Sequence, residues 1–92
     1  MTKTRRILHL SLYAEFFTAI LRGEKPIEYR RRSPRWDKML RKSYDAVRFV
    51  NGYGSRRPWM DCEIVRIEET PEQWLIHISP PFASGNLDLL KL

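Results

Sequence analysis

The sequence has a single cysteine and no long apolar run. Because Cys62 has no second cysteine to pair with, an internal disulfide is impossible, which fits a reducing compartment. No apolar stretch approaches the ~20 residues needed to cross a membrane. The N-terminus, Met-Thr-Lys-Thr-Arg-Arg, lacks the apolar region and cleavage site of a secretory signal. We therefore predict a cytoplasmic protein that does not insert into membranes.

The sequence also lacks the common motifs of metal, nucleotide and serine chemistry. His9 and His77 stand in separate predicted strands, with no further ligand at metal spacing, so we expect no metal site. There is no glycine-rich phosphate loop, and no serine has the context of a nucleophile elbow. We expect no bound cofactor.

Acidic residues are scarce in the first two-thirds of the chain. Residues 1–60 hold 15 Lys and Arg against 5 Asp and Glu, a net charge of +10. Residues 61–92 hold 2 against 6, a net charge of −4, and the two together give the +6 of the whole chain. A basic face attracts polyanions, of which nucleic acid is the commonest. The alternative is a solvated surface that only keeps the protein in solution.

Hydrophobic periodicity predicts one α+β domain over residues 1–92. Alternating or continuous apolar residues predict strands at residues 7–12, 27–30, 46–50, 59–67 and 74–78, the fourth of them twisted or bulged. Residues 82–92 form a last strand or pack as a tail. Residues 31–42 are expected to be a loop with one helical turn around residues 36–40.

Residues 13–22 predict the main helix. Its apolar face, at helical spacing, consists of Tyr13, Phe16, Phe17, Ile20 and Leu21. Ser11 can cap its start, and Gly23 suits the left-handed residue that follows a helix. One early helix followed by strands favours a small, mostly antiparallel β-barrel with a helix against one opening.

The most informative segment is residues 23–30, Gly-Glu-Lys-Pro-Ile-Glu-Tyr-Arg, which reads as Gly-x-Lys-x-x-Glu-x-Arg. Strand alternation places Glu28 and Arg30 on one face and Tyr29 on the other, so we expect Tyr29 in the core. Lys25 and Arg30 can bind a phosphate or a base edge, and Glu28 can accept a hydrogen bond from an exocyclic amine of a base. The alternative is an internal ion pair that ties the turn to the strand.

Further candidate binding residues follow the motif. Basic side chains after residue 30 would contact phosphates and make affinity salt-dependent, and the interleaved aromatic residue suits stacking on an unpaired base. These candidates are Arg31, Arg32, Arg35 and Trp36, beside Lys38, Arg41 and Lys42. The turn at residues 51–54 would form a second wall, with Tyr53 stacking on the ligand and Arg56 and Arg57 beside it. A solvated charge run and a plain hairpin turn are the alternatives.

With this motif, the helix before it and the strands after it, residues 7–68 resemble the activating-signal-cointegrator homology (ASCH) domain family. Gly23, Lys25, Glu28 and Arg30 match the family motif as they stand. The resemblance implies a PUA-like β-barrel whose motif residues line a cleft, and work on RNA or nucleotides.

Some members of that family bind RNA, some cleave it, and others remove the acetyl group from modified cytidine. In that last group the motif lysine acts with a threonine, and here Glu28 stands at the threonine position. We therefore expect a domain that binds RNA or another nucleic acid, preferably at an unpaired or modified nucleotide. The alternatives are a small hydrolase of RNA or N4-acetylcytidine, with Lys25 as base and Glu28 assisting, and a protein-interaction module.

Overall fold

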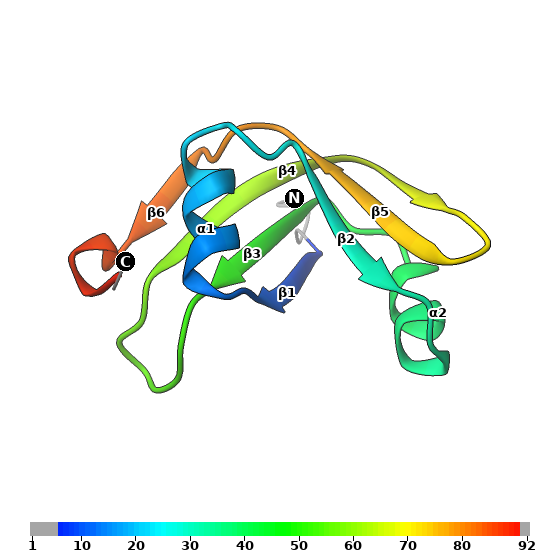
Figure 1. Cartoon of the computed structure of the whole chain (residues 1–92), viewed down its shortest axis with the longest axis horizontal. Helices are drawn as coiled ribbons and strands as arrows, with labels where there is room; N and C mark the ends of the chain where they lie inside the picture. Colours follow the sequence, from blue (N-terminus) through cyan, green and yellow to red (C-terminus); the bar gives the residue numbers. More distant parts are fainter. Residues whose placement is uncertain (1–5, 91–92) are drawn as a thin grey trace, which may run out of the picture.

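The longest strand, β4 (Trp59–Glu69), organises the sheet (Figure 1). The structure is a computed structural model, and it describes residues 6–90. Within them it contains, in chain order, β1 (Ile7–Ser11), α1 (Ala14–Leu21), β2 (Ile27–Arg31), α2 (Pro34–Leu40), β3 (Ala46–Val50), β4, β5 (Gln73–Ile78), β6 (Ala83–Gly85) and a 3-10 turn at Leu87–Leu89. This order confirms the predicted α+β class.

The sheet runs in the order β1-β3-β4-β5-β2, and β6 pairs with β4 beside this path. Among residues 6–90, β1 and β3 form the one parallel pair, and the other pairs are antiparallel. The first part of β4 pairs with β3 and β6, and its second part pairs with β5. The pairing register with β5 shifts between Ile64 and Arg66, which confirms the predicted irregularity in this strand. Such a bulge bends a strand, so one strand serves both halves of the sheet.

The expected barrel is not closed. The path ends at β1 and β2, and no strand ladder joins these two edges within residues 6–90. A side chain bridges them instead: Nη2 of Arg30, on β2, donates to the backbone oxygen of Ser11, on β1, at 2.9 Å. The observed fold is therefore an open, mostly antiparallel six-stranded sheet with two α-helices.

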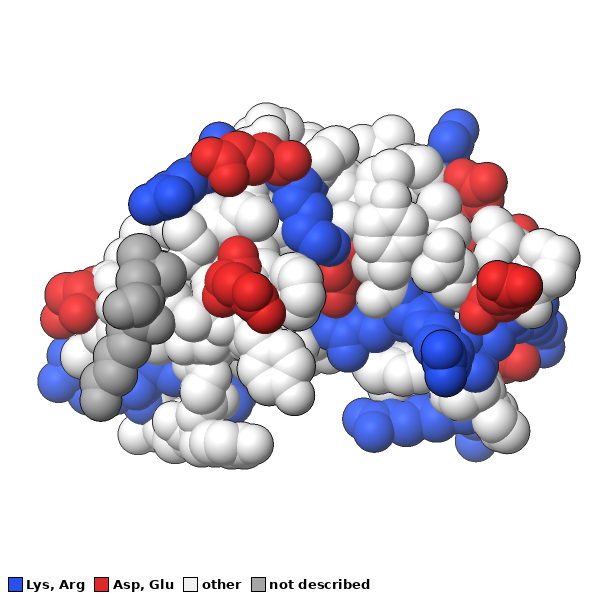
Figure 2. Space-filling model, in the orientation of Figure 1, with Lys and Arg blue, Asp and Glu red and all other residues white. Residues whose placement is uncertain are grey.

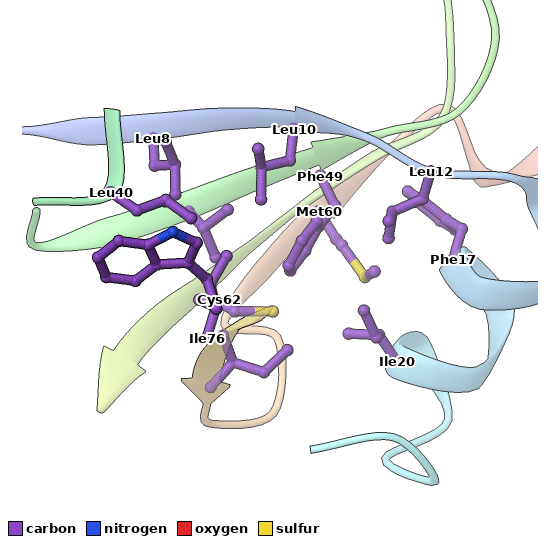
Figure 3. Packing of buried hydrophobic residues seen from close by; sticks show 13 residues of the cluster. Leu8, Leu10, Leu12, Phe17, Ile20, Leu40, Phe49, Met60, Cys62 and Ile76 are labelled. Carbon is purple, nitrogen blue, oxygen red and sulfur yellow. The ribbon is translucent and has the colours of Figure 1, made fainter. Parts of the chain in front are cut away.

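The core lies between the sheet and α1 (Figure 3). Alternate strand residues point inward, and on β5 these are Trp74, Ile76 and Ile78, all buried. Helix α1 contributes Phe17 and Ile20. The other labelled core residues in Figure 3 are Leu8, Leu10, Leu12, Leu40, Phe49, Met60 and Cys62. Burial, with the neighbouring Asp61 carboxylate, raises the pKa of Cys62 to about 12, so this thiol packs as a small apolar group.

The predicted apolar face of α1 is only partly correct. Phe17 is fully buried, but Tyr13 is 77% exposed and Phe16 is 42% exposed. The predicted cap at Ser11 is wrong, because the residue before the helix is Tyr13 and it makes no side-chain cap hydrogen bond. Gly23 has a φ of +76°, which confirms the predicted left-handed residue after the helix.

The predicted helical turn around residues 36–40 belongs to a longer helix, α2. The described part of residues 82–92, predicted as a last strand or a tail, contains a short strand and a turn. Part of the expected loop is helix α2, because Ser33 caps it by accepting the Trp36 backbone N–H at 3.2 Å and Pro34 occupies its first turn. The tail forms the short strand β6 on β4 and then the 3-10 turn. Leu92, the last residue of the predicted tail, lies outside the described residues.

The contrast between the two phenylalanines of α1 gives a matched test of the core. Phe17→Ala should lower the free energy of unfolding by about 3–5 kcal/mol, because it leaves a cavity in a filled core. Phe16→Ala removes the same atoms from a half-exposed position and should cost about 1 kcal/mol. Urea denaturation of both variants measures the difference, and equal losses would contradict this core assignment.

Candidate functional site

Glu28 is a buried acidic residue on the inner face of β2. It lies opposite Ile76 of β5, and only 6% of its surface is exposed. Tyr29, its neighbour, points outward and is 47% exposed, so the prediction that Tyr29 packs in the core is wrong. Burying an unpaired carboxylate costs free energy. Neighbouring groups must therefore compensate the negative charge of Glu28.

Two motif cations supply that compensation. Nζ of Lys25 lies 2.7 Å from Oε1 of Glu28, and it also donates to the backbone oxygen of Ile27 at 2.7 Å. Arg30 approaches the other oxygen, Oε2, with Nε at 3.1 Å and Nη2 at 3.0 Å. The internal ion pair considered from the sequence is thus present. It leaves one acceptor position on Oε1, since a carboxylate oxygen has two lone pairs.

A cleft of about 580 Å³ opens above this ion-paired group. Its walls come from the start of α1, from β2, from the end of β1 and from the loop between β3 and β4. The lining residues are Ser11, Leu12, Tyr13, Phe16, Glu28, Tyr29, Arg30, Arg31, Asn51, Gly52 and Tyr53. Glu28 and Arg30 therefore share one cleft with Arg31 and Tyr53.

Exposed aromatic side chains gather at this cleft. Tyr53, at the tip of the β3–β4 loop, is 97% exposed, and Tyr13, Phe16 and Tyr29 also show large exposed surfaces. Lys25 Nζ lies 5.8 Å from the ring centre of Phe16 and 5.3 Å from that of Tyr29, so the cation that pairs with Glu28 also contacts two of these rings. Aromatic rings exposed around a concave site typically contact a ligand.

The loop that carries Tyr53 is tied to the opposite wall. The Asn51 side-chain amide donates to the backbone oxygen of Leu12 at 2.9 Å, which fixes the base of the loop to the end of β1. Arg56 and Arg57 follow in the same loop but do not line the cleft. Arg56 is exposed, and Arg57 donates to the backbone oxygen of Gly52 at 3.4 Å.

Four other predicted residues do not line the cleft: Lys25, Arg32, Arg35 and Trp36. Trp36, on α2, has the guanidinium carbon of Arg30 5.0 Å from its ring centre and that of Arg35 at 5.1 Å. Arg32 faces away into a network of its own: it donates to both carboxylate oxygens of Asp37, pairs with Glu69 at 2.7 Å and donates to the backbone oxygen of Thr70. The structure therefore gives Arg32 a role in holding β2, α2 and the β4–β5 turn together.

Sequence reasoning missed two aromatic residues of the cleft. Tyr13 and Phe16 were assigned to the core by their helical spacing, yet both line the cleft. The available signal was their position in the first turn of α1, next to the strand end that carries Ser11. The sequence patterns also did not indicate the ion pair between Arg48 and Asp61, in which Nε lies 2.7 Å from Oδ1. This pair lies outside the cleft.

Within residues 6–90 no group of three His, Cys, Asp or Glu side chains has the geometry to hold a metal ion. None of the helices described is both long and apolar enough to span a bilayer. No protein-family model matches the chain, and no curated protein matches it.

The Arg32 network predicts a specific response to acid. Hydrogen bonds from Arg32 and from the Trp74 indole hold the pKa of Asp37 below its ordinary value of 3.8. Because the pKa is lower in the folded state, Asp37 stabilises the fold above pH ~4, and this contribution is lost as the pH falls through the lower, folded value. Asp37→Asn should therefore be less stable than the wild type at neutral pH, and the difference should shrink as the pH falls below about 4.

Urea denaturation across this pH range measures that difference. The matched control is Asp88→Asn, which changes an exposed acidic residue with no ion pair among the residues described. If the stability difference between Asp37→Asn and the wild type stayed constant with pH, this would contradict the inference that the ionised Asp37 carboxylate stabilises the fold.

Proposed function

We propose that the chain is an ASCH-like nucleic-acid-binding domain of the PUA-like type, located in the cytoplasm, that holds an unpaired or modified nucleotide in the cleft above Glu28. The observation that carries this proposal is a concave site in which exposed aromatic rings surround one charge-compensated carboxylate. The match to the Gly-x-Lys-x-x-Glu-x-Arg motif supports the family assignment.

The aromatic rings suit the faces of a base. A cleft of about 580 Å³ lies within the ~300–1,000 Å³ range of sites that enclose small molecules. Stacking of a base on an aromatic side chain contributes ~1–3 kcal/mol and tolerates any base. A duplex presents its bases already stacked on each other, so such a cleft favours an unpaired nucleotide.

The polar groups suit the edge of a base and its phosphate. The acceptor position that remains on Oε1 of Glu28 matches an N–H donor such as the exocyclic amine of cytosine. Arg31, exposed at the wall of the cleft, has no ion pair among the residues described and is available to a phosphate. Lys25 and Arg30 outnumber the single carboxylate between them, so the site retains a net positive charge.

The geometry gives less support to the hydrolase alternative. The Lys25 ammonium donates to Glu28 and to the backbone oxygen of Ile27, so it would have to leave this network before acting as a base. It is also absent from the lining of the cleft. A general base must lie within hydrogen-bond reach of the proton that it removes.

Removal of one stacking ring should weaken binding without unfolding the protein. Tyr53→Ala changes a side chain that is almost fully exposed, so its effect on stability should be small. We expect the dissociation constant for single-stranded RNA, measured by fluorescence anisotropy, to rise by about 5- to 150-fold. Phe82→Ala, an exposed aromatic residue outside the cleft, is the control and should bind as the wild type does. If Tyr53→Ala bound RNA as tightly as the wild type, this would contradict the proposal that the cleft binds a base.

A turnover assay separates binding from hydrolysis. Incubation of the wild type with N4-acetylcytidine and with single-stranded RNA, followed by mass spectrometry, should return both compounds unchanged. Product formed by the wild type but not by Lys25→Ala would replace the binding proposal with the hydrolase alternative.

A further inference from the structure

A second groove, of about 430 Å³, lies between β1 and α2. Apolar and aromatic side chains, including Ile7, Met39 and Tyr44, form its floor. Arg35 and Lys38 of α2 and Lys42, just after the helix, contribute the positive charges at its rim. None of these three cations forms an ion pair with an acidic residue in the part of the chain that the structure describes.

The acidic residues nearest in sequence to this rim are engaged elsewhere. Asp37 accepts hydrogen bonds from Arg32 and from the indole of Trp74, and Asp45 accepts one from the backbone N–H of Arg6. The rim therefore keeps its positive charge. Positive charge along the edge of an apolar groove is typical of surfaces that follow the backbone of a single-stranded nucleic acid.

The second groove and the cleft lie next to each other along β1. Strand β1 contributes to both, since Ser11 lines the cleft and His9, two residues earlier, lines the groove. Two residues of a strand span only about 7 Å. Trp36 lies at the junction, because its ring contacts both Arg30 of the cleft and Arg35 of the groove.

The surface view agrees with this arrangement. Figure 2 shows the molecule hollowed along its lower edge, between the β3–β4 loop and a group of basic side chains around α2.

We propose that the ligand is a single strand of nucleic acid that occupies both hollows: one base lies in the cleft, and the chain passes over Trp36 into the groove, where Lys38 and Lys42 bind its phosphates. This inference rests on the proposed function and adds a requirement on the ligand. A nucleoside or a dinucleotide fills the cleft alone, whereas a longer strand gains the contacts of the groove.

The test compares a dinucleotide with an octanucleotide of single-stranded RNA. In the variant Lys38→Ala/Lys42→Ala both changes are on exposed side chains, so the fold should be retained, which circular dichroism checks. The matched control is Arg22→Ala/Arg66→Ala, which removes the same charge from exposed positions that line neither hollow. Binding of each probe is measured by fluorescence anisotropy as a function of salt.

We expect the Lys38→Ala/Lys42→Ala variant to bind the dinucleotide within about twofold of the wild type. For the octanucleotide, loss of two phosphate contacts should lower the salt slope by about 1.4. A fourfold rise in salt should then cost the wild type about sevenfold more affinity than the variant. The control should keep the slope of the wild type.

The outcomes separate this inference from the proposed function. If Tyr53→Ala weakens binding of both probes but Lys38→Ala/Lys42→Ala changes neither, the cleft binds a nucleotide and the groove proposal is overturned. An equal loss in the control would also overturn it, because the effect would then be one of net charge. If neither probe binds the wild type, both proposals fail.

Discussion

The interaction on which the candidate site depends is the pairing of one buried carboxylate with two cations. Glu28 lies on the inner face of β2, where an uncompensated charge would be strongly destabilising. Lys25 lies in the turn after α1, and Arg30 lies on β2, two residues after Glu28. Together they allow the strand to direct Glu28 inward and Tyr29 outward. The same pairing therefore puts an acceptor at the base of the cleft and an aromatic ring on its wall.

The open seam of the sheet explains why a cleft exists beside this ion pair. The edge strands β1 and β2 are bridged by the contact between Arg30 and the Ser11 backbone oxygen rather than by a ladder. The start of α1 and the β3–β4 loop lie next to this seam and expose their aromatic side chains there. The motif residues thus join the edges, compensate a buried charge and shape one surface.

Local sequence patterns predicted those features that depend on neighbours in the chain. Strand β3 was predicted with its observed bounds, Ala46–Val50, and Gly23 was predicted as the left-handed residue that ends α1. The exposure of Tyr29 was not predictable from alternation, because alternation fixes which residues share a face and not which face is buried. The start signal of α2, Ser33-Pro34, was present but lay within a basic segment that lacks a clear apolar period. The open seam depends on pairing between distant edges, which no local pattern encodes.

A map of where single-stranded RNA contacts the protein is the most direct test of whether the cleft binds a nucleotide. Backbone amide resonances of the isotope-labelled wild type would be followed during titration with an octanucleotide at low salt. We predict the largest shifts at residues 28–31 and 51–53, which line the cleft from two separate parts of the chain. Shifts confined to other regions, such as the acidic β4–β5 turn, or no shifts at all, would contradict it.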